Sequence, residues 1–240
     1  MWDKYFIAGN FSDAVNLTEK YKDQVKIISG GTDLVLELER GGHKGKSIIV
    51  DISRIAGMDT ISLNDEEIHI GALVTHNQVA ASKIIQKHAV CLAEASYQVG
   101  SPQIRNRGTI AGNLITASPA NDTITPLIAL DAHVVLVSST GEGRIKLSEF
   151  FTGVRKTVLR DDELLFEIII PIDLRSKSAY YKFALRNAQA ISLVNAAVQV
   201  NLADDLVTSA SVALGAVAPT IVRMKKVEDA INGKHIDALM

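Results

Sequence analysis

Two glycine-containing polar segments interrupt a chain that otherwise consists of apolar strands and helices. The first, Gly30-Gly31-Thr32-Asp33, directly follows the apolar run from Val25 to Ile28, which predicts a buried strand. The second, Arg105 to Asn113, lies inside a polar stretch from Gly100 to Asp122. Residues without a Cβ let backbone N–H groups approach an anion closely, so each segment is a candidate anion-binding loop.

The presence of two such segments carries more weight than either one alone. A lone Gly-Gly pair is more often a tight connection than a phosphate site. A pair of loops suits a dinucleotide, because a diphosphate needs hydrogen-bond donors from several directions. A polar loop of about twenty residues is uncommon unless it is functional or disordered, and its apolar residues Ile104, Ile110 and Leu114 argue against disorder. Asp122 would accept a hydrogen bond from a ribose or ribityl hydroxyl.

The remaining pattern predicts a mixed chain of helices and strands with a domain boundary between Pro171 and Ser178. We expect Ser12 to cap the first helix, Asn64-Asp65 and Gly141-Glu142-Gly143 to form hairpin turns, and Asp204-Asp205 to join two late strands. The predicted helices are 12–21, 34–39, 83–99 and 223–231, one that begins after Thr75 and one before Asp131. The predicted strands are 25–28, 47–52, 60–63, 68–71, 134–137, 165–170, 180–185, 193–202 and 207–214.

Charge and cysteine usage exclude several classes of function. A net charge of -2 and the absence of a long basic run argue against a nucleic-acid partner. The N-terminus has no apolar signal-peptide core, and the most apolar later segment, Leu164 to Ile172, is short and contains Glu167. We therefore expect a cytoplasmic protein without a membrane span. Because Cys91 is the only cysteine, a metal redox centre is expected on another chain.

Motifs for other kinds of chemistry are missing from the sequence. Gly141-Glu142-Gly143 lacks the third glycine of a Rossmann fingerprint, since Lys146 stands at that position. The histidines form no His-x-x-x-His pair, and no serine lies in a Gly-x-Ser-x-Gly elbow. Cys91 lies in a predicted helix, where a buried inert thiol is expected. Nothing in this set supports hydrolytic catalysis.

The two polar loops and three later motifs together resemble the FAD subunits of the xanthine dehydrogenase and carbon monoxide dehydrogenase family, over nearly the whole chain. The matching segments are Ser29–Leu34, Gly100–Asn113, Thr116–Asp122, Asp162–Leu165, Tyr181–Arg186 and Ala213–Thr220. The family often has a glycine where Ala111 stands here, and one added methyl group could crowd a phosphate. The chain also ends soon after Gly233-Lys234-His235, where relatives usually continue, so a shortened C-terminal domain is expected.

The resemblance implies an α+β fold in two parts. Residues 1–173 would form a two-subdomain FAD-binding domain of the vanillyl-alcohol-oxidase (PCMH) type, divided into about 1–55 and 56–173. Residues 174–240 would form a small domain with a three-stranded antiparallel sheet and helices. By motif, the residues implied to bind FAD are Ile27, Ile28, Ser29, Gly30, Gly31, Thr32, Asp33, Leu34, Gly108, Thr109, Ile110, Ala111, Gly112, Asn113, Thr116, Asp122, Leu165 and Lys182.

The implied function is electron transfer through FAD, with no catalytic residue for the substrate chemistry on this chain. A small partner subunit with [2Fe–2S] clusters would supply electrons, a large molybdopterin subunit would hydroxylate the substrate, and NAD is the acceptor that the analogy favours. Lys182 would stabilise negative charge on the reduced flavin, or would be a strand residue with a packed stem. Two alternatives remain open at this stage: a stand-alone FAD oxidoreductase of the same fold and a flavin-free scaffold subunit.

Overall fold

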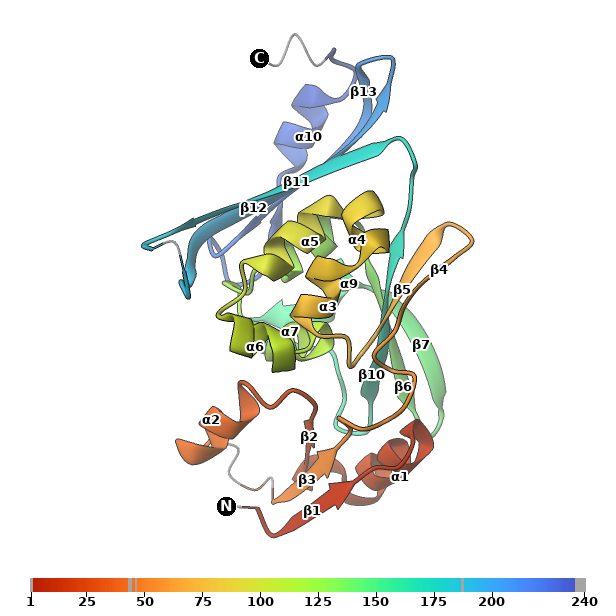
Figure 1. Cartoon of the computed structure of the whole chain (residues 1–240), viewed down its shortest axis with the longest axis vertical. Coiled ribbons are helices and arrows are strands. Elements are labelled where there is room, and N and C mark those ends of the chain that lie inside the picture. The colour runs from red at the N-terminus through yellow and green to blue at the C-terminus, as the bar shows by residue number, and fades with distance from the viewer. Residues whose placement is uncertain (1, 43–44, 46, 187, 236–240) are drawn as a thin grey trace.

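The structure, a computed structural model, describes residues 2–42, 45, 47–186 and 188–235. Three sheets of three, five and four strands follow one another along the chain, and a two-stranded hairpin is inserted in the middle part. Figure 1 shows the N-terminal sheet at one end of an elongated molecule and the C-terminal sheet at the other, with a group of short helices between them. The mixed α and β architecture agrees with the fold class that the resemblance implies. Residues 236–240, at the end of the expected C-terminal domain, lie outside the described residues.

The N-terminal sheet is parallel throughout. Its strands, in spatial order, are β1 (Lys4–Ile7), β3 (Ile48–Asp51) and β2 (Val25–Ile28), and the connections contain α1 (Phe11–Tyr21), the short 3-10 helix η1 (Lys22–Gln24) and α2 (Leu34–Glu39). β1 is not among the predicted strands, although Tyr5, Phe6 and Ile7 are residue types that favour strands; Tyr5 and Ile7 are exposed in the structure. The side chain of Asn10 accepts the Asp13 N–H at 2.9 Å and caps α1, so the prediction of Ser12 as the cap is wrong.

The second sheet is antiparallel and supports most of the hydrophobic core. Its strands, in spatial order, are β4 (Ile61–Asn64), β5 (Glu67–Gly71), β10 (Leu164–Pro171), β6 (His133–Ser138) and β7 (Gly141–Lys146). Ile68 and Ile70 alternate with polar residues along β5, and both are fully buried, as is Ile168 in β10. The hairpin at Asn64-Asp65 is confirmed, whereas Gly141 to Gly143 lie within β7 and not in the turn before it. That turn is made by the two residues that precede Gly141.

Short helices between β5 and β6 cover this sheet and carry part of the candidate site. They are α3 (His76–Ala81), α4 (Lys83–His88), α5 (Val90–Tyr97), α6 (Pro102–Arg107), α7 (Ile110–Thr116) and α8 (Ile124–Ala129), and α9 (Leu147–Phe150) and the hairpin β8 (Phe151–Gly153) and β9 (Lys156–Thr157) follow β7. The prediction of one helix over 83–99 is wrong, because Ala89, with φ -142° and ψ 53°, separates α4 from α5. The stretch expected to be a loop contains α6 and α7, which Ser101 and Thr109 cap.

The C-terminal sheet is antiparallel and crosses the helices at the far end of the molecule from the N-terminal sheet (Figure 1). Its strands are β11 (Ser176–Ala184), β12 (Ser192–Ala203), β13 (Leu206–Gly215) and β14 (Val222–Arg223), and α10 (Lys225–Ile231) follows. The three long strands are as expected, and the short β14 adds a fourth at the edge. Asp204 and Asp205 have φ values of 49° and 65° and form the predicted turn.

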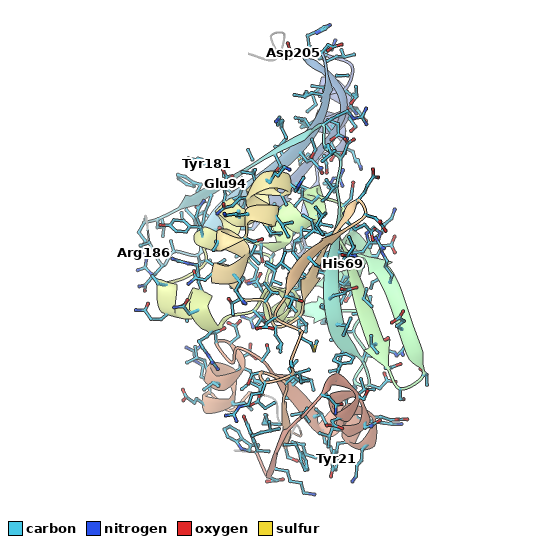
Figure 2. The ribbon with its side chains drawn as sticks, turned by 45° about the vertical axis from the view of Figure 1, so that its right-hand side comes forward. Tyr21, His69, Glu94, Tyr181, Arg186 and Asp205 are labelled. Atoms are coloured by element: carbon cyan, nitrogen blue, oxygen red, sulfur yellow. The ribbon has the colours of Figure 1, made fainter. Side chains whose placement is uncertain are left out.

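Helices of the middle part pack directly against the C-terminal sheet. α5 lies against β11, and α8 lies against β12 and β13. The Glu94 carboxylate on α5 accepts the Tyr180 N–H at 2.9 Å, and Figure 2 shows Glu94 beside the neighbouring Tyr181. The Ala216 N–H also donates to the Pro119 carbonyl at 2.8 Å. Within the described part of the chain, none of the helices has the length and apolar character needed to cross a membrane.

Candidate cofactor-binding site

A cavity of about 930 Å³ lies where the N-terminal sheet faces α6, α7 and the start of β10. Pockets that hold cofactors and other small molecules have volumes of about 300–1,000 Å³. The wall combines three segments: the end of β2 with the loop into α2, the residues from Gly108 to Thr116, and the segment around Leu165. The cavity is therefore large enough for a dinucleotide, and both glycine-containing loops border it.

The first loop leaves the carboxyl end of the parallel strand β2, the edge at which α/β sheets usually bind ligands. Gly31 has φ +76°, a conformation that residues with a Cβ rarely adopt. A Cβ on Gly30 would lie 2.0 Å from the backbone oxygen of Arg107, so only glycine fits there. The glycines that suggested an anion-binding loop are thus required by backbone geometry and by close contact with the second loop.

The second loop forms the start of α7, and hydroxyl groups join it to the first loop. The Thr109 hydroxyl accepts the Gly112 N–H at 3.0 Å and lies 3.2 Å from the Ser29 hydroxyl. The Thr116 hydroxyl lies within hydrogen-bond distance, 3.3 Å, of the Asp33 carboxylate. Asp33 stands at the N-cap of α2 but makes no side-chain cap bond there. The two loops therefore form one continuous wall.

Most of the residues implied to bind FAD line this cavity. The exceptions among the described residues are Ile110, Asp122 and Lys182. Ile110 is fully buried, and its N–H donates to the Val74 carbonyl at 2.9 Å, so it anchors the loop. Ala111 is 3% exposed and lines the cavity, so the fold accommodates its extra methyl group.

Asp122 and Lys182 instead belong to a buried polar group with Tyr180 and Ser192, here named the Asp122 cluster. Lys182 Nζ lies 2.7 Å from Asp122 Oδ2, and the Tyr180 and Ser192 hydroxyls donate to Oδ1 at 2.9 and 2.7 Å. The side chains of Lys182 and Asp122 are only 6% and 9% exposed. Burial and the nearby Asp122 carboxylate raise the pKa of Tyr180 far above its usual value, which keeps its hydroxyl a donor.

The Asp122 cluster borders the cavity without forming its wall. Lys182 Nζ also donates to the Gln98 carbonyl at 3.2 Å. The next residue, Val99, lines the cavity, as does Asn121, which precedes Asp122. The cluster therefore holds two wall segments in place and joins them to β11 and β12 of the C-terminal sheet.

His76 and Arg155 line the cavity but are not among the residues expected from the sequence, because neither lies in a glycine motif. His76 is the first residue of α3 and is 2% exposed. Arg155 follows the short strand β8, and its guanidinium lies 2.8 Å from the Glu37 carboxylate on α2, which closes one side of the cavity. Only the three-dimensional contact with the loops identifies them.

Cys91 has the inert character expected from the sequence. It is fully buried in α5 and is absent from the wall of the cavity that the structure describes. Burial raises the pKa of its thiol to about 12, so the reactive thiolate is not populated at neutral pH. Cysteine chemistry therefore has no place at this site.

Comparisons with known proteins identify the family and its cofactor. Residues 2–173 match the family described as the FAD binding domain in molybdopterin dehydrogenase, and residues 179–240 match the CO dehydrogenase flavoprotein C-terminal domain. The nicotinate dehydrogenase FAD-subunit of Eubacterium barkeri is 38% identical, with 96% of this chain and 79% of that protein covered. The xanthine dehydrogenase FAD-binding subunit of Escherichia coli O157:H7 is 31% identical, with 93% of this chain and 77% of that protein covered.

A solved carbon monoxide dehydrogenase from Hydrogenophaga pseudoflava has a chain with the same fold. Its TM-score is 0.91 at 29% identity, and the match covers 98% of this chain and 82% of that chain. Both the sequence and structure comparisons thus extend over nearly the whole chain. The protein therefore belongs to the family of FAD-binding flavoproteins of molybdopterin dehydrogenases.

Proposed function

We propose that this chain is the electron-transfer subunit of a molybdenum hydroxylase complex and that the diphosphate of FAD is held where the two glycine-containing loops meet. The observation that carries the proposal is the contact at Gly30, where a Cβ would meet the Arg107 backbone oxygen at 2.0 Å. Because glycine has no side chain, the main chain of both loops can come close to an anion at the edge of a cavity of about 930 Å³.

The residues present fit FAD in three respects. The loops Ser29–Asp33 and Gly108–Asn113 supply glycines and hydroxyl groups around a cavity of sufficient volume. Leu165, Val99 and Ile104 give the wall an apolar portion, which suits an aromatic ring system. In addition, the buried His76 Nδ1 has no hydrogen-bond partner among the described residues. One wall thus offers both polar groups and apolar surface.

The residues of the chain would bind and orient the cofactor, whereas the substrate chemistry belongs elsewhere. When bound, FAD supplies the capacity to accept and release electrons. The two loops with Thr116 would fix its phosphates, and Leu165 would restrict water beside its ring. Lys182 and Asp122 would act mainly by holding Gln98–Val99 and Asn121 in place, with the Lys182 charge next to the cavity.

Names of relatives such as the carbon monoxide dehydrogenase medium chain support partner subunits, and the identity and cofactors of those subunits remain part of the proposal. We assign [2Fe–2S] clusters to a small partner subunit and molybdopterin to a large one, because the only cysteine here is buried and protonated. NAD is the proposed acceptor, and the cytoplasm is the proposed location. We also propose domains at 1–173, with subdomains 1–55 and 56–173, and at 174–240, a division supported by the separate sheets.

An absorbance spectrum of the purified chain, recorded before and after adding FAD, tests cofactor binding. We expect stoichiometric flavin bands, their bleaching on chemical reduction, and their return when NAD is added. The isolated chain with FAD should not oxidise purines, aldehydes or nicotinate. Turnover of an organic substrate by the chain alone would favour a stand-alone oxidoreductase. A folded chain that does not bind FAD would contradict the proposal. If the flavin bands return with oxygen but not with NAD, NAD is rejected as the acceptor and FAD is kept as the cofactor.

A further inference from the structure

His76 is a buried polar side chain in the cavity wall to which none of the motifs assigns a role. Its side chain is nearly inaccessible to solvent, and its Nδ1 atom has no hydrogen-bond partner among the described residues. A buried nitrogen without a partner is unfavourable, because it has lost its hydrogen bonds to water. Most buried polar atoms do have partners, so this one calls for a specific explanation.

The backbone around His76 holds the ring against both loops. The His76 N–H donates to the Gly108 carbonyl at 3.1 Å, and Thr75 forms a β-bridge with Thr109. A Cβ on Gly108 would lie 3.3 Å from His76 Cδ2 and 3.5 Å from the Thr32 hydroxyl oxygen. The imidazole therefore lies at the meeting point of the two loops.

The ring is neutral at physiological pH in the absence of ligand. Burial, together with the charge of Arg105, lowers the pKa of His76 to about 4. A neutral imidazole has one N–H donor and one acceptor nitrogen. It can donate a hydrogen bond to an anion without the cost of burying a permanent charge.

We propose that His76 is a further cofactor-binding residue, which donates a hydrogen bond from its ring N–H to an oxygen of the FAD diphosphate. The proposal rests on the proposed placement of FAD in this cavity. The donor would be Nε2, which is bonded to the Cδ2 atom that faces Gly108 and Thr32, whereas Nδ1 is enclosed by protein atoms. The competing explanation is that the ring only fills space, with a buried water molecule on its nitrogen.

The test compares His76→Gln, which keeps an N–H donor, with His76→Phe, which keeps a planar ring and has none. His88→Phe is the control, because His88 ends α4 and does not line the cavity. FAD is titrated into each apo-protein and its fluorescence gives the dissociation constant. Thermal unfolding of each apo-protein shows whether the fold is retained. The ³¹P NMR spectrum of FAD bound at saturation reports on the diphosphate itself.

We expect His76→Phe to weaken FAD binding about tenfold, which corresponds to about 1.4 kcal/mol, and to move the ³¹P resonances. His76→Gln should stay within about threefold of the parent, and His88→Phe should match it. Unchanged affinity in His76→Phe, or equal losses in both His76 variants with unmoved ³¹P resonances, would overturn the role of His76. Failure of the parent protein to bind FAD would instead reject the cofactor site itself.

Discussion

The cavity wall and the Asp122 cluster are neighbours in the fold, yet they differ in whether their polar groups have partners inside the protein. In the cluster, one carboxylate is paired with an ammonium group and two hydroxyls, all inside the protein. In the cavity wall, glycines expose the backbone and the buried His76 nitrogen lacks a partner. Polar residues that satisfy one another stabilise a fold, whereas polar groups left without partners beside a cavity indicate a ligand.

The largest expected effect concerns the stability of the cluster. Asp122→Asn leaves Lys182 buried without its counter-ion, and breaking a buried pair costs about 3–5 kcal/mol. Urea unfolding of the apo-protein measures this loss. Asp162→Asn, in a pair that is open to solvent, is the control and should leave the unfolding midpoint unchanged.

A double variant shows whether the uncompensated charge causes that loss. Asp122→Asn combined with Lys182→Met removes both charges, so it should be more stable than Asp122→Asn alone. The contrary result is a double variant that loses as much free energy of unfolding as Asp122→Asn and Lys182→Met lose when added together. That result would show that Asp122 and Lys182 do not stabilise the fold as a pair.

The next largest effect should appear in the affinity for FAD and not in the stability of the Asp122 cluster. Gly30→Ala forces the two loops apart, because the new Cβ would meet the Arg107 backbone oxygen. Overpacking of this kind costs about 2–3 kcal/mol, which is about 30- to 150-fold in the dissociation constant for FAD. Gly143→Ala in β7 has open space around it and serves as the control. Equal binding by the parent and Gly30→Ala would show that this contact does not shape the site.

A smaller effect is expected at Glu228, a second carboxylate with its partners inside the protein. It accepts the Val212 N–H at 2.8 Å and lies 2.7 and 2.9 Å from Arg223 Nε and Lys225 Nζ. Burial raises the pKa of Glu228, but these partners outweigh that effect and lower it to about 2. Its unfolded pKa is about 4.3, so its stabilising contribution is complete above about pH 5 and falls away towards pH 2.

Glu228→Gln should therefore lower the free energy of unfolding by about 2 kcal/mol at pH 7. The difference from the parent should shrink as the pH falls from about 5 to 2. Chemical denaturation at a series of pH values measures it, and a difference that stays constant over this range would contradict the assigned role. FAD affinity should not change, since Glu228 lies outside the cavity wall that the structure describes.

The smallest effect is expected for Gly112→Ala. Its Cβ would lie 2.9 Å from the Thr109 hydroxyl oxygen, a side-chain atom that can move slightly. We expect about threefold weaker FAD binding in the fluorescence titration, roughly 0.6 kcal/mol. A loss as large as that of Gly30→Ala would mean that the second loop is as tightly constrained as the first.

The sequence locates the two loops because their glycines and hydroxyl residues are visible in it. It does not predict α6 and α7 within the second polar stretch, nor the contact between Gly30 and Arg107, which depends on tertiary structure. Strand β1 is absent from the prediction although Tyr5, Phe6 and Ile7 favour strands. The break at Ala89 depends on tertiary packing and has no local signal. The same holds for the positions of Asp122 and Lys182, whose partners Tyr180 and Ser192 come from strands far along the chain. His76 was missed because it lies outside both glycine motifs and meets the loops only through tertiary contacts.

Backbone hydrogen exchange, measured by mass spectrometry with and without FAD, tests the central claim most directly. If the cavity between the loops holds the cofactor, FAD should slow exchange in peptides covering 27–34 and 108–116. Peptides from β12 and β13 should change much less, because the Asp122 cluster is already complete without the ligand. FAD binding with no added protection in either loop would contradict this account.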